Sequence, residues 1–153
     1  AWYDLLQADL VRREDEAGLR ASRLDIEALI ARERARGVPA SRIVLMGFSQ
    51  GCAMTLLTGL RHAERLAGLV GLSGYLPLAD TTASERAAAS VALPIFLAHG
   101  RSDTVIPLAR ATASRDVLQS LGCVVEWHEY PMAHSVCPQE VADLNRWLLG
   151  VLA

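Results

Sequence analysis

Lysine is absent from the 153 residues, so all 15 basic side chains are arginines. The 17 acidic residues nearly balance them, and the formal net charge is −2. Phosphate binding needs a concentrated basic face, which this composition does not supply. The balance of charge therefore argues against nucleic acid as a partner.

Cysteine is scarce, and the sequence contains no C-x-x-C pair. The three residues Cys52, Cys123 and Cys137 are odd in number and widely spaced, which argues against a disulfide framework and a cysteine-rich zinc site. A reducing, cytoplasmic compartment fits this usage best. Long apolar runs are also missing, because no run approaches the roughly 18 residues of a membrane span. We therefore expect no stable membrane insertion.

The residues that are present predict one α/β domain over 1–153. Hydrophobic residues make up 52% of the chain, and short apolar runs alternate with stretches of helical periodicity. Strands are expected at 42–48, 66–73, 94–99 and 123–130, and helices at 19–36, 50–62, 107–121 and 138–152. Such alternation indicates a mostly parallel sheet flanked by helices. Catalytic groups in these sheets lie at the carboxyl ends of the strands.

A candidate nucleophile lies at the first of these strand ends. The sequence Gly47-Phe48-Ser49-Gln50-Gly51 matches G-x-S-x-G, directly after one expected strand and before a helix. In that context Ser49 occupies a strained turn that exposes its hydroxyl. Side chains at Gly47 and Gly51 are expected to collide across the turn. The alternative is a loop serine that caps the next helix.

A serine hydroxyl needs a base to take its proton, and the chain has four histidines. His134 follows the last expected strand, and Asp103 follows the strand before it. Asp103 can hold the His134 ring in the useful tautomer. The order Ser49, Asp103, His134 is that of α/β hydrolases. His99 is a rival to His134, since it precedes Asp103 by four residues and could instead brace the acid loop.

Metal and nucleotide sites have little support. His99, Asp103 and His134 could ligate zinc, but they lack the spacing of a known zinc motif. Gly68, Gly71 and Gly74 do not form the dinucleotide fingerprint and are expected to permit close packing in the sheet. We therefore expect no metal and no other cofactor.

Several motifs together resemble the phospholipase/carboxylesterase family of α/β hydrolases, which includes bacterial carboxylesterases and acyl-protein thioesterases. They are Trp2-Tyr3-Asp4, the segment Ile43–Gly51, Leu72-Ser73-Gly74-Tyr75-Leu76-Pro77, His99-Gly100-x-x-Asp103-x-Val105-x-Pro107 and Tyr130-Pro131-Met132-x-His134, with Glu140 opening the last helix. The resemblance covers essentially the whole chain.

The resemblance implies Ser49 as nucleophile, Asp103 as acid and His134 as base, with the Gln50 backbone N–H as one oxyanion donor. Family members usually have glycine where Cys52 stands. They also begin with further strands and a His-Gly loop that supplies the other oxyanion donor. The resemblance therefore implies that this chain starts after those N-terminal strands.

The expected substrate is a small-molecule ester or an acyl thioester, with lysophospholipids also implied by the resemblance. The apolar side chains Leu5, Leu6, Leu76 and Met132 line an acyl channel in this interpretation and pack in the core or loops in the alternative one. A serine peptidase or lactonase on the same fold, and a degenerate domain kept for binding, stay open as other functions. A homodimer also stays open.

Overall fold

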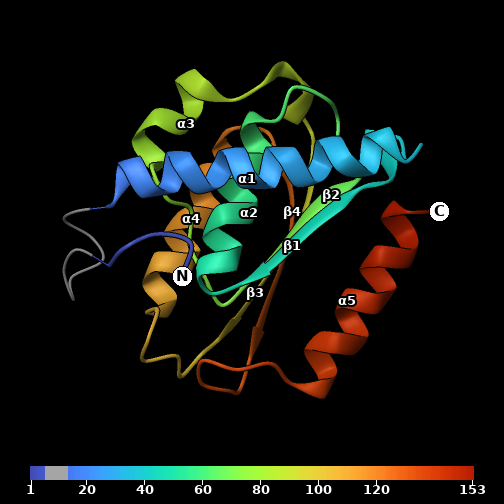
Figure 1. Ribbon diagram of the computed structural model, residues 1–153. Helices are drawn as coiled ribbons and strands as arrows, with labels where there is room; N and C mark the ends of the chain where they lie inside the picture. The colour runs from blue at the N-terminus through green and yellow to red at the C-terminus, as the bar shows by residue number, and fades with distance from the viewer. Residues whose placement is uncertain (6–13) are drawn as a thin grey trace.

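The computed structural model describes residues 1–5 and 14–153, which form a sheet with helices on both faces (Figure 1). The strands are β1 (Val44–Phe48), β2 (Gly68–Leu72), β3 (Pro94–Gly100) and β4 (Val124–Tyr130). The helices are α1 (Glu16–Ala35), α2 (Gln50–Arg61), α3 (Ala79–Glu85), α4 (Leu108–Ser120) and α5 (Pro138–Val151), with short 3-10 turns at Ala40–Arg42 and Ala88–Ser90. The four expected strands and four expected helices are confirmed, with small shifts at their ends.

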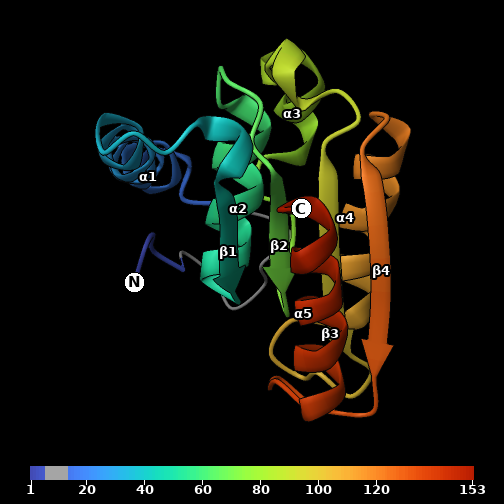
Figure 2. The same ribbon diagram turned by 90° about the vertical axis from the view of Figure 1, so that its right-hand side faces the viewer.

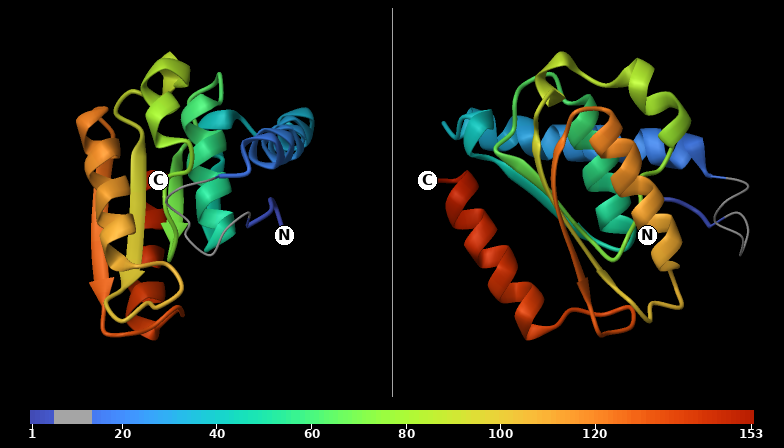
Figure 3. Two further views of the ribbon diagram at one scale, coloured as in Figure 1. Left: turned by 90° about the vertical axis from the view of Figure 1, so that its left-hand side faces the viewer. Right: turned by 180° about the vertical axis from the view of Figure 1, so that it is seen from behind.

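The sheet is parallel at every pairing, and its strand order β1-β2-β3-β4 follows the chain. Parallel neighbours need a crossover connection, and α2 and α4 lie within two of the three crossovers. These two helices cover one face, whereas α5 covers the other (Figure 2). The long helix α1 packs on α2, away from the sheet (Figure 3).

Buried apolar side chains fill each of these contacts. Leu56 of α2 and Leu118 of α4 belong to the cluster on one face of the sheet. Phe96 of β3 and Trp147 of α5 belong to the cluster on the other face. Strand β2 is buried along its whole length, which explains why its sequence is a continuous apolar run rather than an alternating one.

Local signals in the sequence set the ends of the helices. The Asp15 side chain caps α1 by accepting from the Gly18 N–H at 3.0 Å. Gly37 follows the end of α1 at φ +92°, a left-handed conformation that favours glycine. Pro138 occupies the first turn of α5, where its missing N–H costs no hydrogen bond.

The strands all point the same way, so their carboxyl ends meet at one edge of the sheet. Ser49 follows β1, Asp103 follows β3, and His134 follows β4. Within the described residues, none of the helices combines the length and apolar character needed to cross a bilayer.

Candidate active site

Ser49 sits in a strained turn between β1 and α2. Its backbone has φ 56° and ψ −117°, a region that non-glycine residues rarely adopt. The Ser49 N–H donates to the Leu72 carbonyl at 2.9 Å, which ties the turn to the neighbouring strand. The sequence-based prediction of a strand–turn–helix context for Ser49 is confirmed.

The two glycines of the motif differ in what they do. A Cβ on Gly47 would meet the Gly51 backbone and lie 2.7 Å from the Cys52 nitrogen. A Cβ on Gly51 would meet nothing within 4 Å. The expectation of a collision is therefore right for Gly47 and wrong for Gly51, because only Gly47 faces the first turn of the following helix.

His134 lies between Ser49 and Asp103 and is hydrogen-bonded to both. Its Nε2 is 3.1 Å from the Ser49 Oγ, and its Nδ1 is 2.7 Å from the Asp103 Oδ2. Nδ1 carries the proton in this arrangement, because a carboxylate only accepts. Nε2 is then free to accept the serine proton, which is the tautomer that a general base requires.

Asp103 is held by several donors in a buried position. Its Oδ1 accepts from the Val105 N–H at 2.8 Å and the Ile106 N–H at 2.9 Å, while Oδ2 faces His134. Burial by itself raises the pKa of the Asp103 carboxyl. The His134 hydrogen bond and the two backbone donors outweigh burial, so this pKa lies below its ordinary value. The side chain is therefore an anion at neutral pH.

The structure separates the two rival histidines. His99, at 1% exposure, donates from Nε2 to the Ile106 carbonyl at 2.8 Å, and its Nε2 lies 3.4 Å from the Asp103 Oδ2. His99 thus stabilises the loop that carries Asp103, as the alternative interpretation allowed. The other two histidines belong to separate contacts: His62 pairs with Glu27 at 2.6 Å and His128 with Glu126 at 2.8 Å.

Gln50 is the first residue of α2, where backbone N–H groups have no partner within the helix. Its side chain clamps the start of the chain: Oε1 accepts from the Trp2 N–H at 3.0 Å, and Nε2 donates to the Tyr3 carbonyl at 3.1 Å. Tyr3 in turn shares a 2.7 Å hydrogen bond with the Tyr75 hydroxyl. Gln50 thereby holds the backbone of Trp2 and Tyr3 against the start of α2. The motif alone did not predict this role.

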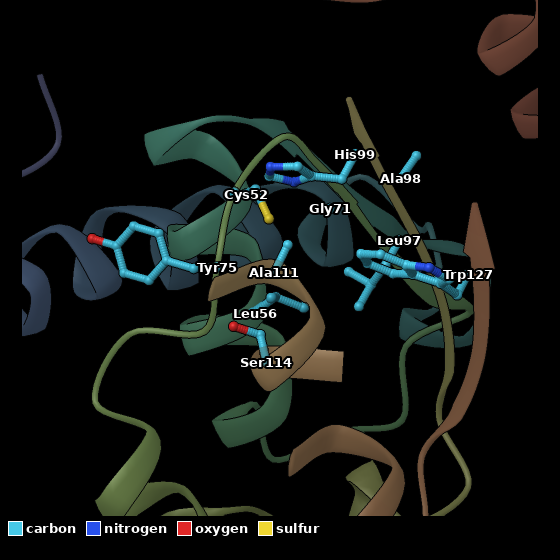
Figure 4. A pocket seen from close by; sticks show the side chains of 11 residues that line it. Cys52, Leu56, Gly71, Tyr75, Leu97, Ala98, His99, Ala111, Ser114 and Trp127 are labelled. Carbon is cyan, nitrogen blue, oxygen red and sulfur yellow. The ribbon is translucent and has the colours of Figure 1, made fainter. Parts of the chain in front are cut away.

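A small pocket of about 10 Å³ lies between α2, α4 and the sheet, and Cys52 and His99 are among the residues that line it (Figure 4). Its volume is that of about one water molecule. Cys52 lines it with 1% exposure, and burial raises the pKa of its thiol to about 12. A Cβ on either Gly71 or Gly74 would lie 2.7 Å from the Cys52 sulfur. The prediction that these glycines permit close packing agrees with this geometry, and the thiol is inert.

One surface groove contains Ser49, and another adjoins the loop that follows Asp103. The first, of about 660 Å³, runs along the open edge of β1 and includes Ser49 and Phe48. The second, of about 880 Å³, lies between α4, α3 and the loop after Asp103. Its apolar lining includes Leu76, Leu78, Val105, Pro107 and Val117, and Glu14, Asp80 and Arg110 are among its charged residues.

The expected substrate-binding residues fall in different surroundings. Leu76 is buried in the core yet lines the 880 Å³ groove. Met132 packs against the cluster beneath α5, in agreement with the alternative interpretation. Leu5 is 63% exposed, and Leu6 lies outside the described residues. Across residues 1–5 and 14–153, no group of three or more His, Cys, Asp or Glu side chains could hold a metal ion.

A parallel α/β sheet with a serine in a tight strand-to-helix turn defines the α/β-hydrolase class. Residues 1–151 match the phospholipase/carboxylesterase family, and the chain belongs to this family. The resemblance seen in the sequence motifs is thereby confirmed.

Curated relatives point the same way. The acyl-protein thioesterase 1 of Yarrowia lipolytica is 41% identical over 152 residues, which cover 97% of this chain and 67% of the relative. That of Gibberella zeae is 37% identical over 155 residues, which cover 96% of this chain and 66% of the relative. The chain thus spans about two thirds of the length of these relatives.

Solved structures superpose over the whole chain. The crystal structure of Arabidopsis thaliana SOBER1 has a TM-score of 0.92 at 26% identity, and covers 100% of this chain and 74% of its own. Zea mays acyl-protein thioesterase 2 has a TM-score of 0.88 at 26% identity, with 100% and 73% coverage. The architecture is therefore that of an α/β hydrolase of this family.

Proposed function

We propose that this protein is a serine hydrolase of the carboxylesterase type, which cleaves carboxylic esters and acyl thioesters through an acyl-Ser49 intermediate. The observation that carries the proposal is the continuous hydrogen-bond chain from Ser49 through His134 to Asp103, with distances of 3.1 Å and 2.7 Å. Membership of the phospholipase/carboxylesterase family supports the same chemistry.

In the first half of the reaction, His134 Nε2 takes the Ser49 proton as Oγ bonds to the substrate carbonyl carbon. The carbonyl oxygen becomes an anion beside the start of α2, where the Gln50 N–H donates to it and the helix dipole favours negative charge. Collapse breaks the bond to the leaving group. His134 then gives its proton to the departing alkoxide or thiolate.

In the second half, His134 takes a proton from water, and the hydroxide attacks the acyl carbon. The bond to Ser49 Oγ breaks, His134 returns the proton to Oγ, and the free acid leaves. Asp103 keeps its negative charge throughout and stabilises the imidazolium that forms twice in the cycle. Its buried position strengthens this attraction, because few water molecules screen it.

The 880 Å³ groove supports an acyl chain as the specificity element. Its volume lies in the range of small-molecule sites, roughly 300–1,000 Å³. Thr104 and Val105, directly after Asp103, form part of its lining. Leu76 and Val105 contact the acyl chain in this proposal, and Leu5, Leu6 and Met132 keep the same role as expectations from the sequence. Relatives named acyl-protein thioesterase favour a thioester of this kind.

Blocking the groove tests this assignment. Val105→Trp fills it and is expected to shorten the longest p-nitrophenyl ester that the protein cleaves, while acetate turnover stays within about threefold. Val91→Trp is the matched control, because Val91 is 56% exposed and Val105 is 55% exposed. Equal chain-length profiles for both variants would remove the groove from the proposal.

A fluorophosphonate probe tests the nucleophile itself, on protein expressed from the full reading frame that contains this chain. The wild type and the exposed-serine control Ser120→Ala are expected to label equally, and Ser49→Ala is expected not to label. An unlabelled wild type would favour the degenerate binding domain. Labelling with peptide or lactone turnover but no ester turnover would favour a peptidase or lactonase.

We further infer a cytoplasmic, reducing compartment. Cys52, Cys123 and Cys137 are free thiols, and the first two are buried, which suits a chain that forms no disulfides. Fractionation of cells that express the tagged protein tests this inference, and recovery from the secreted fraction would contradict it.

A further inference from the structure

Phe48 lies against the His134 ring. The two ring centroids are 4.8 Å apart, and the ring planes are tilted by 50°. Aromatic pairs at 4.5–7 Å in tilted geometry attract one another beyond the area they bury. The contact therefore joins the residue before the proposed nucleophile to the proposed base.

The sheet explains why Phe48 points there. Side chains alternate along a strand, so Phe48 shares a face with Val44, and Val44 packs in the cluster beneath α5. Gly47 takes the opposite face, where α2 leaves no room for a Cβ. Phe48 pairs in register with Leu72. The same rigid backbone therefore carries Ser49 and Phe48.

The His134 side chain has hydrogen bonds at both ring nitrogens and an aromatic contact with Phe48. Nδ1 is held by Asp103 and Nε2 by Ser49, and the side chain is 18% exposed. Phe48 stands against the ring itself. Hydrogen bonds to ring nitrogens lie in the plane of the imidazole, so they constrain tilting out of that plane least, and Phe48, itself 38% exposed, contacts the ring at a tilt of 50°.

Among the described residues, charged or titratable groups near the histidine loop lie in the β3–α4 loop, on β4 and on α5. Asp103 contacts the ring from the β3–α4 loop. Arg101, in the same loop, pairs with Glu129 of β4 at 3.4 Å. Glu140, in the first turn of α5, is fully buried, and burial raises the pKa of its carboxyl. Asp103 is therefore the charged side chain bonded to the imidazolium, and Phe48 adds a neutral aromatic ring.

We propose that Phe48 is a positioning residue for His134, a role that rests on the proposed hydrolase function. Its ring keeps the imidazole in plane with Ser49 and Asp103. It also stabilises the imidazolium that forms when the serine proton is transferred, because a cation within about 6 Å of an aromatic face is attracted to it. The inference adds a specific partner to the base, at a position that G-x-S-x-G leaves open.

Two substitutions of Phe48 distinguish the effect of its aromatic face from that of its apolar volume. Phe48→Leu keeps an apolar side chain and removes the aromatic face, and Phe48→Tyr keeps the face. With p-nitrophenyl acetate, Phe48→Leu is expected to lower kcat about tenfold at nearly constant KM. The acid limb of its kcat/KM profile is expected to move to lower pH, because the imidazolium is no longer favoured. Phe48→Tyr is expected to stay within about twofold of the wild type.

Several outcomes would overturn the inference. One is a Phe48→Leu variant that matches the wild type in kcat and pH profile, and another is a Phe48→Tyr variant that loses as much activity as Phe48→Leu. A loss confined to KM would also contradict it. Thermal melting checks that each variant is folded, with Val124→Ala, an exposed side chain at the far end of β4, as control. Phe48→Met replaces the leucine variant if that variant does not fold.

The wild type distinguishes this inference from the proposed function. If the wild type cleaves the ester and Ser49→Ala does not, the proposed function stands whatever the Phe48 variants do. If the wild type is inactive and takes no fluorophosphonate, the proposed function fails, and the role of Phe48 fails with it.

Discussion

Asp103→Asn changes a single atom of the site and reverses its hydrogen bonding. The asparagine has the same shape as the aspartate, but one oxygen becomes an NH₂ group. In the structure Oδ1 accepts from the N–H groups of Val105 and Ile106. The amide oxygen of the substituted side chain must take that place, because an NH₂ group there would face two donors.

The NH₂ group is therefore forced into the position of Oδ2, 2.7 Å from the His134 Nδ1. His99 cannot draw it away, since its Nε2–H is also a donor at 3.4 Å. Nδ1 must then accept, and the ring proton moves to Nε2, which can no longer take the proton of Ser49. An imidazole locked in the wrong tautomer costs about 10⁴-fold in kcat in serine hydrolases that use this arrangement.

The assay is turnover of p-nitrophenyl acetate at pH 7.5, with thermal melting to show that the isosteric variant is folded. Asp143→Asn is the matched control: its carboxylate accepts from the Tyr130 hydroxyl at 2.8 Å, outside the triad. We expect the control to stay within about threefold of the wild type. An Asp103→Asn variant that keeps more than a tenth of wild-type kcat would refute the tautomer argument.

Three further predictions concern stability. Gly47→Ala is expected to cost about 3 kcal/mol in urea unfolding, because its Cβ meets helix backbone; a smaller loss than for Gly71→Ala would contradict the geometry. Gly71→Ala is expected to lower the free energy of unfolding by about 1–3 kcal/mol. The loss is expected to be smaller in a Cys52→Ala background, because the added Cβ lies 2.7 Å from the Cys52 sulfur. If the losses of the two single variants simply add in the double variant, the contact is refuted. Hydrogen bonds from Arg20 and Arg61 lower the pKa of Glu85 to about 2 from 4.5. The contribution of Glu85 to the free energy of unfolding is therefore present above pH 4.5 and is lost as the pH falls towards 2. Glu85→Gln is expected to weaken the dependence of the unfolding free energy on pH between 4.5 and 2, and an unchanged dependence would contradict the role of these hydrogen bonds.

The central strands β2 and β3 were predictable because nearly all of their residues are buried. Leu69, Val70 and Ile95 have no exposed surface, and strands covered on both faces appear in sequence as continuous apolar runs. Helix α3 was less visible. It was not among the expected helices, because its seven residues are mostly small or polar.

The three proposed catalytic residues were also accessible from sequence, because each follows a predicted strand and parallel strands end at one edge. The contacts that orient them were not. The contact between Phe48 and His134 depends on the path of the β4–α5 loop towards the end of β1. The periodicity of the sequence does not predict the path of a loop. The bond from His99 to Ile106 likewise depends on the turn of the acid loop.

Cys52 illustrates a departure that sequence could describe but not explain. A glycine at this position would enlarge the small pocket that the Cys52 side chain lines. Here the thiol fills space between Gly71 and Gly74, so a larger residue is accommodated by smaller neighbours. Cys52, Gly71 and Gly74 pack together as a set, and their spacing along the chain does not reveal this contact.

The most direct test of the proposed chemistry is the mass of the reacting protein. Protein from the full reading frame is mixed with a p-nitrophenyl ester, quenched in acid within the first turnover and digested. An acyl-Ser49 intermediate predicts one added acyl group, located on the peptide that contains Ser49 and absent in Ser49→Ala. Ester turnover with no acylated peptide, or with the acyl group on another residue, would contradict the mechanism.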